Sequence, residues 1–330
     1  MPAQRSTDKE METMESTEDT EPRSFTLGHS THLWSVLSMA VALALWATAE
    51  AATPSYTYKP FTPLPGLSLQ GVYGVEYGSA TMVGASADPN WENLLHGWQG
   101  TATAGFTIRP TLEVRAINRA KWTAGSFFDA FSGLLLGYVQ SPSAFTPIYV
   151  PGCTHVYVRG LNDFNQVVGA CQGEDGWNHA FYWDAETGAR LLDPIVMENG
   201  TPVVWQLWGC GATAINHEGY IAGGCDHSGY VHHYQLPEAA ARIDIPLAGQ
   251  PARTFLLGIT DVGRILGTVC PFEPGTCRGL IWTPGVTTLI DYPGETFLTA
   301  IVGQAPGARG TLFGYHGGNG TAEGFRAIRQ

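Results

Sequence analysis

The most conspicuous candidates for chemistry are Asp226, His227, His232 and His233, four side chains within eight positions. Imidazole and carboxylate groups are the ligands that zinc and copper accept. His232 and His233, however, are adjacent in a segment that we expect to be a β-strand, where neighbouring side chains point to opposite faces. Both cannot easily reach one ion. We therefore expect no metal site, and we expect these histidines to bond to neighbouring loops.

No motif for a nucleophile or for phosphate binding occurs in the sequence. A Gly-x-Ser-x-Gly elbow, a His-Glu-x-x-His pair and a phosphate loop are all missing. The carboxylates Asp163, Glu218 and Asp261 fall in short turns that recur along the chain, where such residues commonly satisfy backbone groups. We interpret them as turn residues rather than as a glycosidase pair, and we expect neither a catalytic residue nor a cofactor.

Aromatic side chains are the remaining lead for a binding function, because exposed aromatic rings are common anchors at binding surfaces. Trp183 and Trp282 occupy predicted strand positions, so we expect them to pack between repeats. Other tryptophans fall in predicted loops, where their flat faces can contact a sugar or a protein. The residues proposed for such a surface are Trp91, Trp177, Trp205 and Trp208.

The six cysteines all lie in 153–277, and an even number in an exported protein indicates disulfides. Cys210 and Cys225 are equidistant from a predicted turn and should face each other across a hairpin, and Cys270 and Cys277 flank the loop PFEPGT. Cys153 and Cys171 are then left to bridge each other around the preceding hairpin, although the two residues are three positions out of strict register. Buried free thiols are the alternative. The expected pairs are Cys153–Cys171, Cys210–Cys225 and Cys270–Cys277.

The elements that must position these residues are repeated. Residues 161–169 (LNDFNQVVG), 215–223 (INHEGYIAG) and 259–267 (ITDVGRILG) share an apolar residue, a polar turn and a short apolar strand ending in glycine. Such a turn between apolar runs predicts a hairpin. Two further strands follow each hairpin, so each unit offers about four strands. The apolar anchors are Ile117, Leu161, Ile215, Ile259 and Ile301, with an earlier unit at Val75.

Six units of about 46 residues account for 52–330, and a repeat of 40 to 50 residues with four strands predicts a β-propeller blade. The last unit stops after its third strand, at 323–328. The stretch 58–66, with its prolines, resembles the missing closing strand. We therefore predict that the N-terminal strand completes the last blade and closes the ring, which removes exposed sheet edges. A proline-rich linker is the alternative.

The repeat pattern resembles the extracellular HAF-repeat family of bacterial proteins. The similarity rests on an apolar-Asn-x-x-Gly turn, the tripeptide His179-Ala180-Phe181 and a strand that ends in Asp-x-Pro-Gly. It is strong over 155–294 and weak before 120. The resemblance implies secretion and a propeller-like repeat fold. It implies no catalytic residue, because the family has no established activity that could be carried over.

The N-terminal part divides into an acidic leader, 1–32, and an apolar segment with small-x-small cleavage patterns, 33–51. The run of 14 uncharged residues at 33–46 is short for a bilayer span, which needs about 20 residues. It is typical of a secretory signal peptide. An uncleaved anchor with a cytoplasmic tail is the alternative, and the leader also fits a start codon assigned too far upstream. We expect a secreted or periplasmic location without stable membrane insertion after cleavage.

Composition narrows the function further. Seventeen basic residues against 29 acidic ones give a net charge of −12, and no basic cluster is present, so nucleic acid is not an expected partner. With 41 glycines and only 14% charged residues, the chain suits tight turns and sheets rather than coiled coils.

We expect a monomeric, non-enzymatic scaffold that binds a protein or glycan through loops on one face. The insertion at 195–208 is a candidate for that surface. A polysaccharide hydrolase or lyase with a site in the central channel is the alternative, and a structural surface-layer role is a third. The hydrolase hypothesis predicts titratable side chains that converge at one mouth of the channel.

Overall fold

The structure is a computed structural model. It describes residues 54–330 apart from 65, 77–78, 89–90, 102–103, 110–111, 193–194, 199–200, 205–209, 226, 306–309 and 318–321. The chain divides into two units, Met1–Met39 and Ala40–Gln330. The first unit, with the acidic leader, and the whole predicted signal segment lie outside the described residues.

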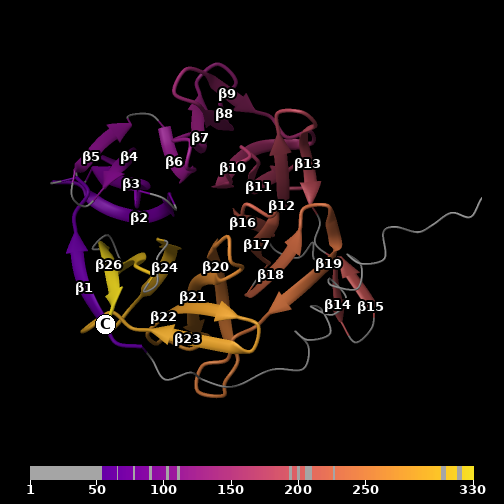
Figure 1. Ribbon diagram of the computed structural model, residues 1–330. Helices are drawn as coiled ribbons and strands as arrows, with labels where there is room; N and C mark the ends of the chain where they lie inside the picture. The colour runs from indigo at the N-terminus through magenta and orange to yellow at the C-terminus, as the bar shows by residue number, and fades with distance from the viewer. Residues whose placement is uncertain are drawn as a thin grey trace, which may run out of the picture. The chain divides into compact units, whose positions relative to one another are not determined.

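The described chain forms six sheets arranged in a ring, each built on four antiparallel strands, a six-bladed β-propeller (Figure 1). The first strands of neighbouring blades contact one another in turn: β2, β6, β10, β16, β20, β24 and again β2. These six inner strands surround the central channel. Each blade then continues outward through three further strands, as the sequence repeat predicts.

The strands of the first three blades are β2 (Ser68–Val75), β3 (Met82–Asp88), β4 (Trp91–Thr101), β5 (Gly105–Arg109); β6 (Leu112–Ile117), β7 (Thr123–Asp129), β8 (Leu134–Gln140), β9 (Phe145–Ile148); and β10 (Cys153–Leu161), β11 (Val167–Gly173), β12 (Asn178–Asp184), β13 (Gly188–Leu192). Those of the last three are β16 (Gly211–Ile215), β17 (Tyr220–Cys225), β18 (Ser228–His233), β19 (Leu236–Ile243); β20 (Ala252–Ile259), β21 (Ile265–Pro271), β22 (Arg278–Thr283), β23 (Val286–Ile290); and β24 (Thr299–Gln304), β25 (Leu312–His316), β26 (Glu323–Arg329), β1 (Tyr56–Phe61).

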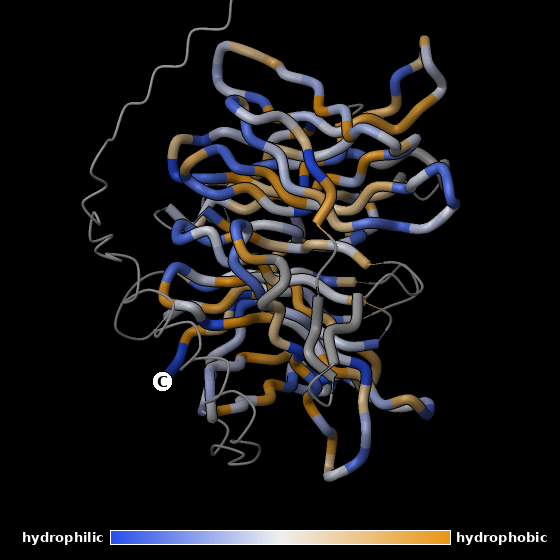
Figure 2. Tube along the Cα trace, turned by 90° about the vertical axis from the view of Figure 1, so that its right-hand side faces the viewer, coloured by the Kyte–Doolittle hydropathy of each residue, from blue (hydrophilic) through white to orange (hydrophobic). Residues whose placement is uncertain are grey.

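The hydrophobic core lies between the blades, because each sheet buries both faces against its neighbours. A buried cluster joins every neighbouring pair, such as Val168 and Tyr182 of blade 3 with Ile221 of blade 4. Trp183 is buried between blades and Trp282 is partly buried, as expected for these strand positions. In the side view of Figure 2, hydrophobic stretches run along the strands, and several connecting turns are hydrophilic.

The ring is closed by the N-terminal strand, as predicted. Strand β1 pairs antiparallel with β26 from Tyr56↔Arg329 to Phe61↔Gly324 and becomes the outer strand of blade 6. The Tyr58 ring packs edge-on against Tyr292, with 5.1 Å between ring centroids. Its hydroxyl donates to the backbone oxygen of Asp291 at 2.9 Å. The prolines of this stretch are tolerated because β1 is an edge strand.

Two details differ from the sequence prediction. The sequence places the anchor of blade 6 at Ile301, but the residue equivalent to Ile259 at the end of the inner strand is Gln304. In blade 6 a longer connection follows the inner strand in place of the short polar turn that marks the other anchors. The insertion forms a hairpin, β14 (Ile195–Glu198) and β15 (Thr201–Val204), instead of a face loop. Strand β14 joins the outer strand β19 in parallel, so the hairpin extends blade 4 at the circumference of the ring.

All three predicted disulfides are present. Cys210 and Cys225 lie opposite each other, just beyond the Gly211↔Gly224 pair. The register mismatch of Cys153–Cys171 is absorbed by an irregularity in β10. Cys270–Cys277 closes the turn between β21 and β22. Disulfides of this kind are typical of proteins that fold in an oxidising compartment. No helix in the described part of the chain has the length and apolarity to cross a membrane.

The closing strand gives the ring an alkaline sensitivity that can be measured. Burial, reinforced by Tyr56, Asp291 and Tyr292, raises the pKa of Tyr58 to about 12. The unfolded value is about 10. The neutral phenol therefore stabilises the folded state fully below about pH 10, and this contribution is lost as the pH rises toward about 12.

We expect Tyr58→Phe to lower the Tm at neutral pH, since it removes the bond to Asp291, and we expect the deficit to shrink between about pH 10 and 12. Differential scanning calorimetry across this range tests it. Tyr149→Phe, at an exposed residue, is the matched control. A deficit that stays constant through pH 12 would contradict the role given to Tyr58.

Candidate functional site

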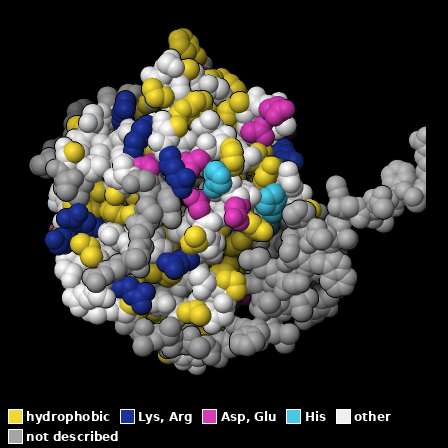
Figure 3. Space-filling model, viewed as in Figure 1, with side chains coloured by type: hydrophobic (Ala, Val, Ile, Leu, Met, Phe, Trp, Pro, Cys, Tyr) yellow, Lys and Arg dark blue, Asp and Glu magenta, His cyan; other side chains and the backbone are white. Residues whose placement is uncertain are grey.

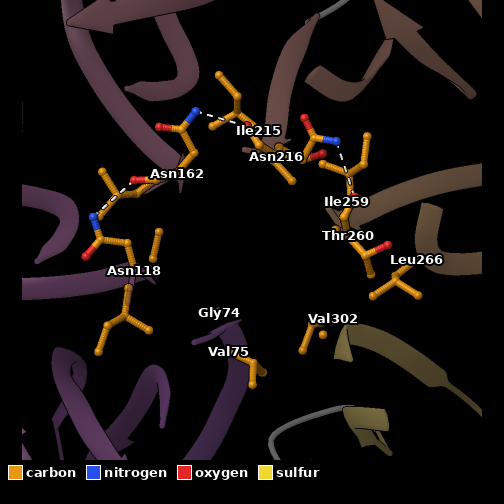
Figure 4. A pocket seen from close by; sticks show the side chains of 18 of the residues that line it. Gly74, Val75, Asn118, Asn162, Ile215, Asn216, Ile259, Thr260, Leu266 and Val302 are labelled. Atoms are coloured by element: carbon orange, nitrogen blue, oxygen red, sulfur yellow. Dashed lines mark hydrogen bonds between the residues drawn. The ribbon is translucent and has the colours of Figure 1, made fainter. Parts of the chain in front are cut away.

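One face of the ring carries a belt of polar residues at the ends of the inner strands; we call it the belt face. In blades 2 to 5 the belt residues are Asn118, Asn162, Asn216 and Thr260, shown in Figure 4. Each side-chain oxygen accepts the backbone N–H four residues later, at 2.9–3.0 Å, and so shapes the turn. This is the role predicted for the recurring polar turn residues.

The belt asparagines also connect the blades. Asn118 Nδ2 donates to the backbone oxygen of Asn162 at 3.0 Å, Asn162 Nδ2 to Asn216 at 2.9 Å, and Asn216 Nδ2 to Thr260 at 3.2 Å. All four residues are buried. An asparagine can fill both roles because its amide carries an acceptor and a donor. Thr260 carries a hydroxyl instead of an amide, and there the series of amide bonds ends.

Charged side chains converge over the middle of the belt face (Figure 3). Arg119 of blade 2 reaches Asp163 of the next blade, with 3.3 Å from Nε to Oδ2, and Asp261 of blade 5, with 2.7 Å from Nη2 to Oδ2. Blades 2 and 5 face each other across the six-membered ring. His217 lies at the edge of this group, with Nδ1 3.9 Å from Asp163 Oδ2. Arg119 therefore spans the belt-face mouth of the channel.

The two carboxylates, Asp163 and Asp261, make the same kind of hydrogen bond to a neighbouring blade. Asp163 Oδ1 accepts the backbone N–H of Arg119 at 2.9 Å, and Asp261 Oδ1 accepts that of His217 at 3.1 Å. Each carboxylate thus binds the turn of the preceding blade. Because the same contact recurs between two different pairs of blades, it serves blade assembly, with Arg119 shared between the two carboxylates.

The channel itself is lined by side chains that a repeated β-bulge directs inward. Every inner strand has a register shift near its end, and the residue skipped by the pairing faces the channel. A bulge leaves one residue unpaired and re-aims its side chain. The six skipped residues are Tyr73, Arg115, Arg159, Thr213, Leu257 and Val302.

Two adjoining cavities occupy the channel, of about 120 Å³ next to the belt and about 190 Å³ nearer the opposite face. The larger one is also lined by Glu113, Tyr157 and Tyr315. Arg115 pairs with Glu113, and its guanidinium lies 3.7 Å from the centre of the Tyr73 ring. Burial raises the pKa of both Tyr73 and Tyr315, so their hydroxyls stay protonated.

The opposite face carries all three disulfides, and we call it the disulfide face. It consists of the turns between second and third strands and the connections between blades. A groove of about 500 Å³ lies here between blades 4 and 5. Its walls include His227, Phe272 and the ion pair of Arg242 with Asp244. Phe272 is 46% exposed, and the Arg253 guanidinium lies 5.3 Å from its ring centre.

Several exposed aromatic residues also lie on the disulfide face, as their positions between the strands show. Those outside strands stand in turns or blade connections of the disulfide face, except Phe164, which lies in a belt-face turn; Phe128, Phe145 and Phe255 are exposed within strands. The set on the disulfide face is Phe131, Tyr149, Trp177, Phe272 and Phe297.

Two of the four tryptophans proposed from the sequence lie among the described residues. Trp177 lies in the turn between β11 and β12 and is 43% exposed. Its backbone N–H donates to Asp175 Oδ1 at 2.9 Å, and this bond, followed by one from His179, holds the pKa of Asp175 below its usual range. Trp91 was expected in a loop, but it is the first residue of strand β4. Trp205 and Trp208 lie outside the described residues.

The histidines considered as metal ligands make other contacts. His232 is buried and its Nδ1 lies 3.1 Å from the backbone oxygen of His233. His233 Nε2 lies 3.0 Å from the backbone oxygen of Glu218, in the neighbouring turn. Asp226 lies outside the described residues. Within the part of the chain that the structure describes, no three potential metal-binding side chains gather.

Comparison with known proteins finds similar solved structures but no family. No family model matches the chain, and no curated protein matches it. Among solved structures, the chain is similar to a sialidase of Trypanosoma rangeli, with 7% identity, a TM-score of 0.49 and coverage of 84% of this chain and 60% of the sialidase. It is also similar to TolB from Acinetobacter baumannii (11%, 0.40, 72% and 60%) and to AofleA from Arthrobotrys oligospora (10%, 0.43, 86% and 92%). The chain thus spans about three fifths of the sialidase and TolB chains.

Sequence reasoning missed the channel residues. The skipped positions hold Tyr, Arg, Arg, Thr, Leu and Val, so they share no residue type. A weak signal exists one position later, where glycine or alanine always stands: Gly74, Ala116, Gly160, Ala214, Gly258 and Gly303.

The belt predicts how one asparagine stabilises the ring. We expect Asn162→Asp to keep the turn, because Oδ1 still accepts the N–H of Gln166, but to lose the bond to Asn216 and place an anion against that carbonyl. Asn162→Ala loses both interactions and should cost about 1–3 kcal/mol of unfolding free energy. Urea denaturation measures both. Asn178→Asp, at an exposed residue of β12, is the control. Equal stability of Asn162→Asp and wild type would contradict the inter-blade role.

Proposed function

We propose that this protein is an exported, non-enzymatic binding protein that holds a glycan in the groove of the disulfide face. The observation that carries the proposal is the groove between blades 4 and 5, whose volume of about 500 Å³ falls in the range of ligand sites. It combines an exposed aromatic ring with a charged hydrogen-bonding pair. Sugars present apolar C–H faces and hydroxyl groups, and these two features match them.

The chemistry of the groove favours a neutral or weakly charged sugar. Ile245, Pro246, Pro251 and Ala252 supply apolar surface. Arg242 and Asp244 supply donors and acceptors, and because they neutralise each other they need no charged ligand. Polar groups placed beside apolar surface fix the orientation of a ligand.

The disulfides support binding because they hold the aromatic loops in place. Phe272 lies inside the loop closed by Cys270–Cys277, and Trp177 follows the bridge Cys153–Cys171 by a few residues. Loops that are already ordered lose less conformational entropy when a ligand binds. The remaining exposed aromatic residues of this face extend the surface that a longer glycan can contact.

Export is part of the proposal. It is supported by three disulfides and by the apolar segment 33–51 with its cleavage patterns. The resemblance to the extracellular HAF-repeat family points to the same compartment.

We expect Phe272→Ala to weaken glycan binding at least about tenfold, since aromatic anchors often carry much of the binding energy. The measurement starts with an array of immobilised polysaccharides and continues by calorimetric titration of an oligosaccharide from the strongest hit. Phe164→Ala, an exposed phenylalanine on the belt face, is the matched control and should bind as wild type does.

Two results would overturn this proposal. One is equal affinity of wild type and Phe272→Ala for the oligosaccharide. The other is an array without any bound glycan, together with capture of a protein partner that Phe272→Ala abolishes, which would assign the groove to a protein ligand.

A polysaccharide hydrolase or lyase is the second candidate, because titratable residues do converge at the belt-face mouth. Asp163 and Asp261 are both present there, on either side of Arg119. Their bonds to backbone amides favour the assembly role described above. If they were the catalytic pair, Asp261→Asn would abolish release of reducing or unsaturated ends from the polysaccharide hit. We expect the purified wild type to release none; turnover by wild type that is lost in Asp261→Asn would establish the enzyme instead.

A further inference from the structure

The channel holds a cation, Arg159, that forms no ion pair with any residue the structure describes. Arg159 is the residue skipped by the bulge in β10, and it lines both channel cavities. Among the described residues, no hydrogen bond or ion pair involves its guanidinium. Its neighbour Arg115, by contrast, is paired with Glu113 and lies over the Tyr73 ring.

The surroundings add to the positive potential at this residue. The side chain of Arg159 is exposed to the channel. Burial, followed by repulsion from Arg115, lowers the pKa of Arg159 below its ordinary value. An arginine remains protonated in proteins nevertheless. Because Glu113 is already paired with Arg115, the channel keeps an excess positive charge at Arg159, which an anion can neutralise.

Uncharged donors surround the same space. Tyr73, Tyr157 and Tyr315 line the cavity of about 190 Å³ together with Thr213. Among the described residues, no hydrogen bond involves the three phenolic hydroxyls. A phenol that is held neutral donates a hydrogen bond to an anion rather than repelling it. Arg119 and its two carboxylates span the belt-face mouth, whereas this cavity lies nearer the disulfide face, from which we expect a ligand to enter.

We propose that the channel binds an oxyanion, the carboxylate or phosphate group of a small ligand, on the Arg159 guanidinium with hydroxyls of the neighbouring tyrosines. The planar guanidinium presents two parallel N–H donors that match either group. The volume admits a small anion or one acidic group of a larger molecule, not a folded protein segment. This site is separate from the groove at Phe272 and does not depend on its function.

The test uses calorimetric titration of the purified protein with inorganic phosphate, sulfate and acetate, at constant ionic strength in chloride. We expect saturable binding by wild type and by Phe272→Ala, and at least tenfold weaker binding by Arg159→Gln. Preference for acetate over phosphate would identify a carboxylate site, and the reverse preference a phosphate site. Arg109→Gln, on the outer strand β5, is the matched control and should bind as wild type does.

A second readout separates a ligand site from a structural arginine. In anion-poor buffer we expect Arg159→Gln to melt at the same temperature as wild type or higher, because the substitution removes an unpaired charge. Addition of the bound anion should then raise the Tm of wild type only. The proposal is wrong if none of the three anions binds, if Arg159→Gln binds as tightly as wild type, or if Arg159→Gln melts well below wild type without anion.

Discussion

The structure depends on how closely six inner strands approach one another around one axis. At glycines of this point of closest approach even a Cβ is crowded: one on Gly258 would lie 2.7 Å from the backbone oxygen of Val302, and one on Gly160 would lie 2.9 Å from the Cα of Ala214. Only glycine or alanine occurs at these six positions. The bulge that precedes each small residue turns one side chain into the channel. The same local feature, a bulge followed by a small residue, therefore both allows the inner strands to pack closely and places the side chains that line the channel.

The two faces of the ring use their polar residues differently. On the belt face, asparagine amides, carboxylates and Arg119 bond to neighbouring blades, so their hydrogen-bonding capacity is spent on holding the ring together. On the disulfide face, covalent bridges order the loops, and Phe272 and Trp177 remain exposed. Because disulfides stabilise the loops of that face, its side chains are available to bind a ligand.

Local patterns predicted most of the fold. The polar turn after each anchor, the strand lengths and the cysteine spacing depend on residues close together in the chain, and these gave the blade repeat and the disulfides. The closing strand could be predicted because its own pattern matched the element missing from the last unit. The anchor of blade 6 was misplaced by three residues, since the turn that marks the other anchors is absent there.

The channel could not be predicted in the same way. A bulge shifts the register by one residue, so strict alternation places Arg159 on the wrong side of its strand. The contact of Arg119 with Asp261 joins residues 142 positions apart, and no local pattern signals it. The groove combines a turn of blade 4, a blade connection and a turn of blade 5, which become neighbours only when the ring forms.

The pairing of β1 with β26 also constrains how the protein is made. Ser55 and Gln330, hydrogen-bonded in the finished ring, are 275 positions apart, so β1 can pair only after β26 has been made. Contacts of such long range form late and slow folding. A prematurely terminated chain leaves blade 6 incomplete and its sheet edges exposed. Closure of the ring thus couples two strands from opposite ends of the described chain, and separating β1 from β26 opens a sheet edge in blade 6.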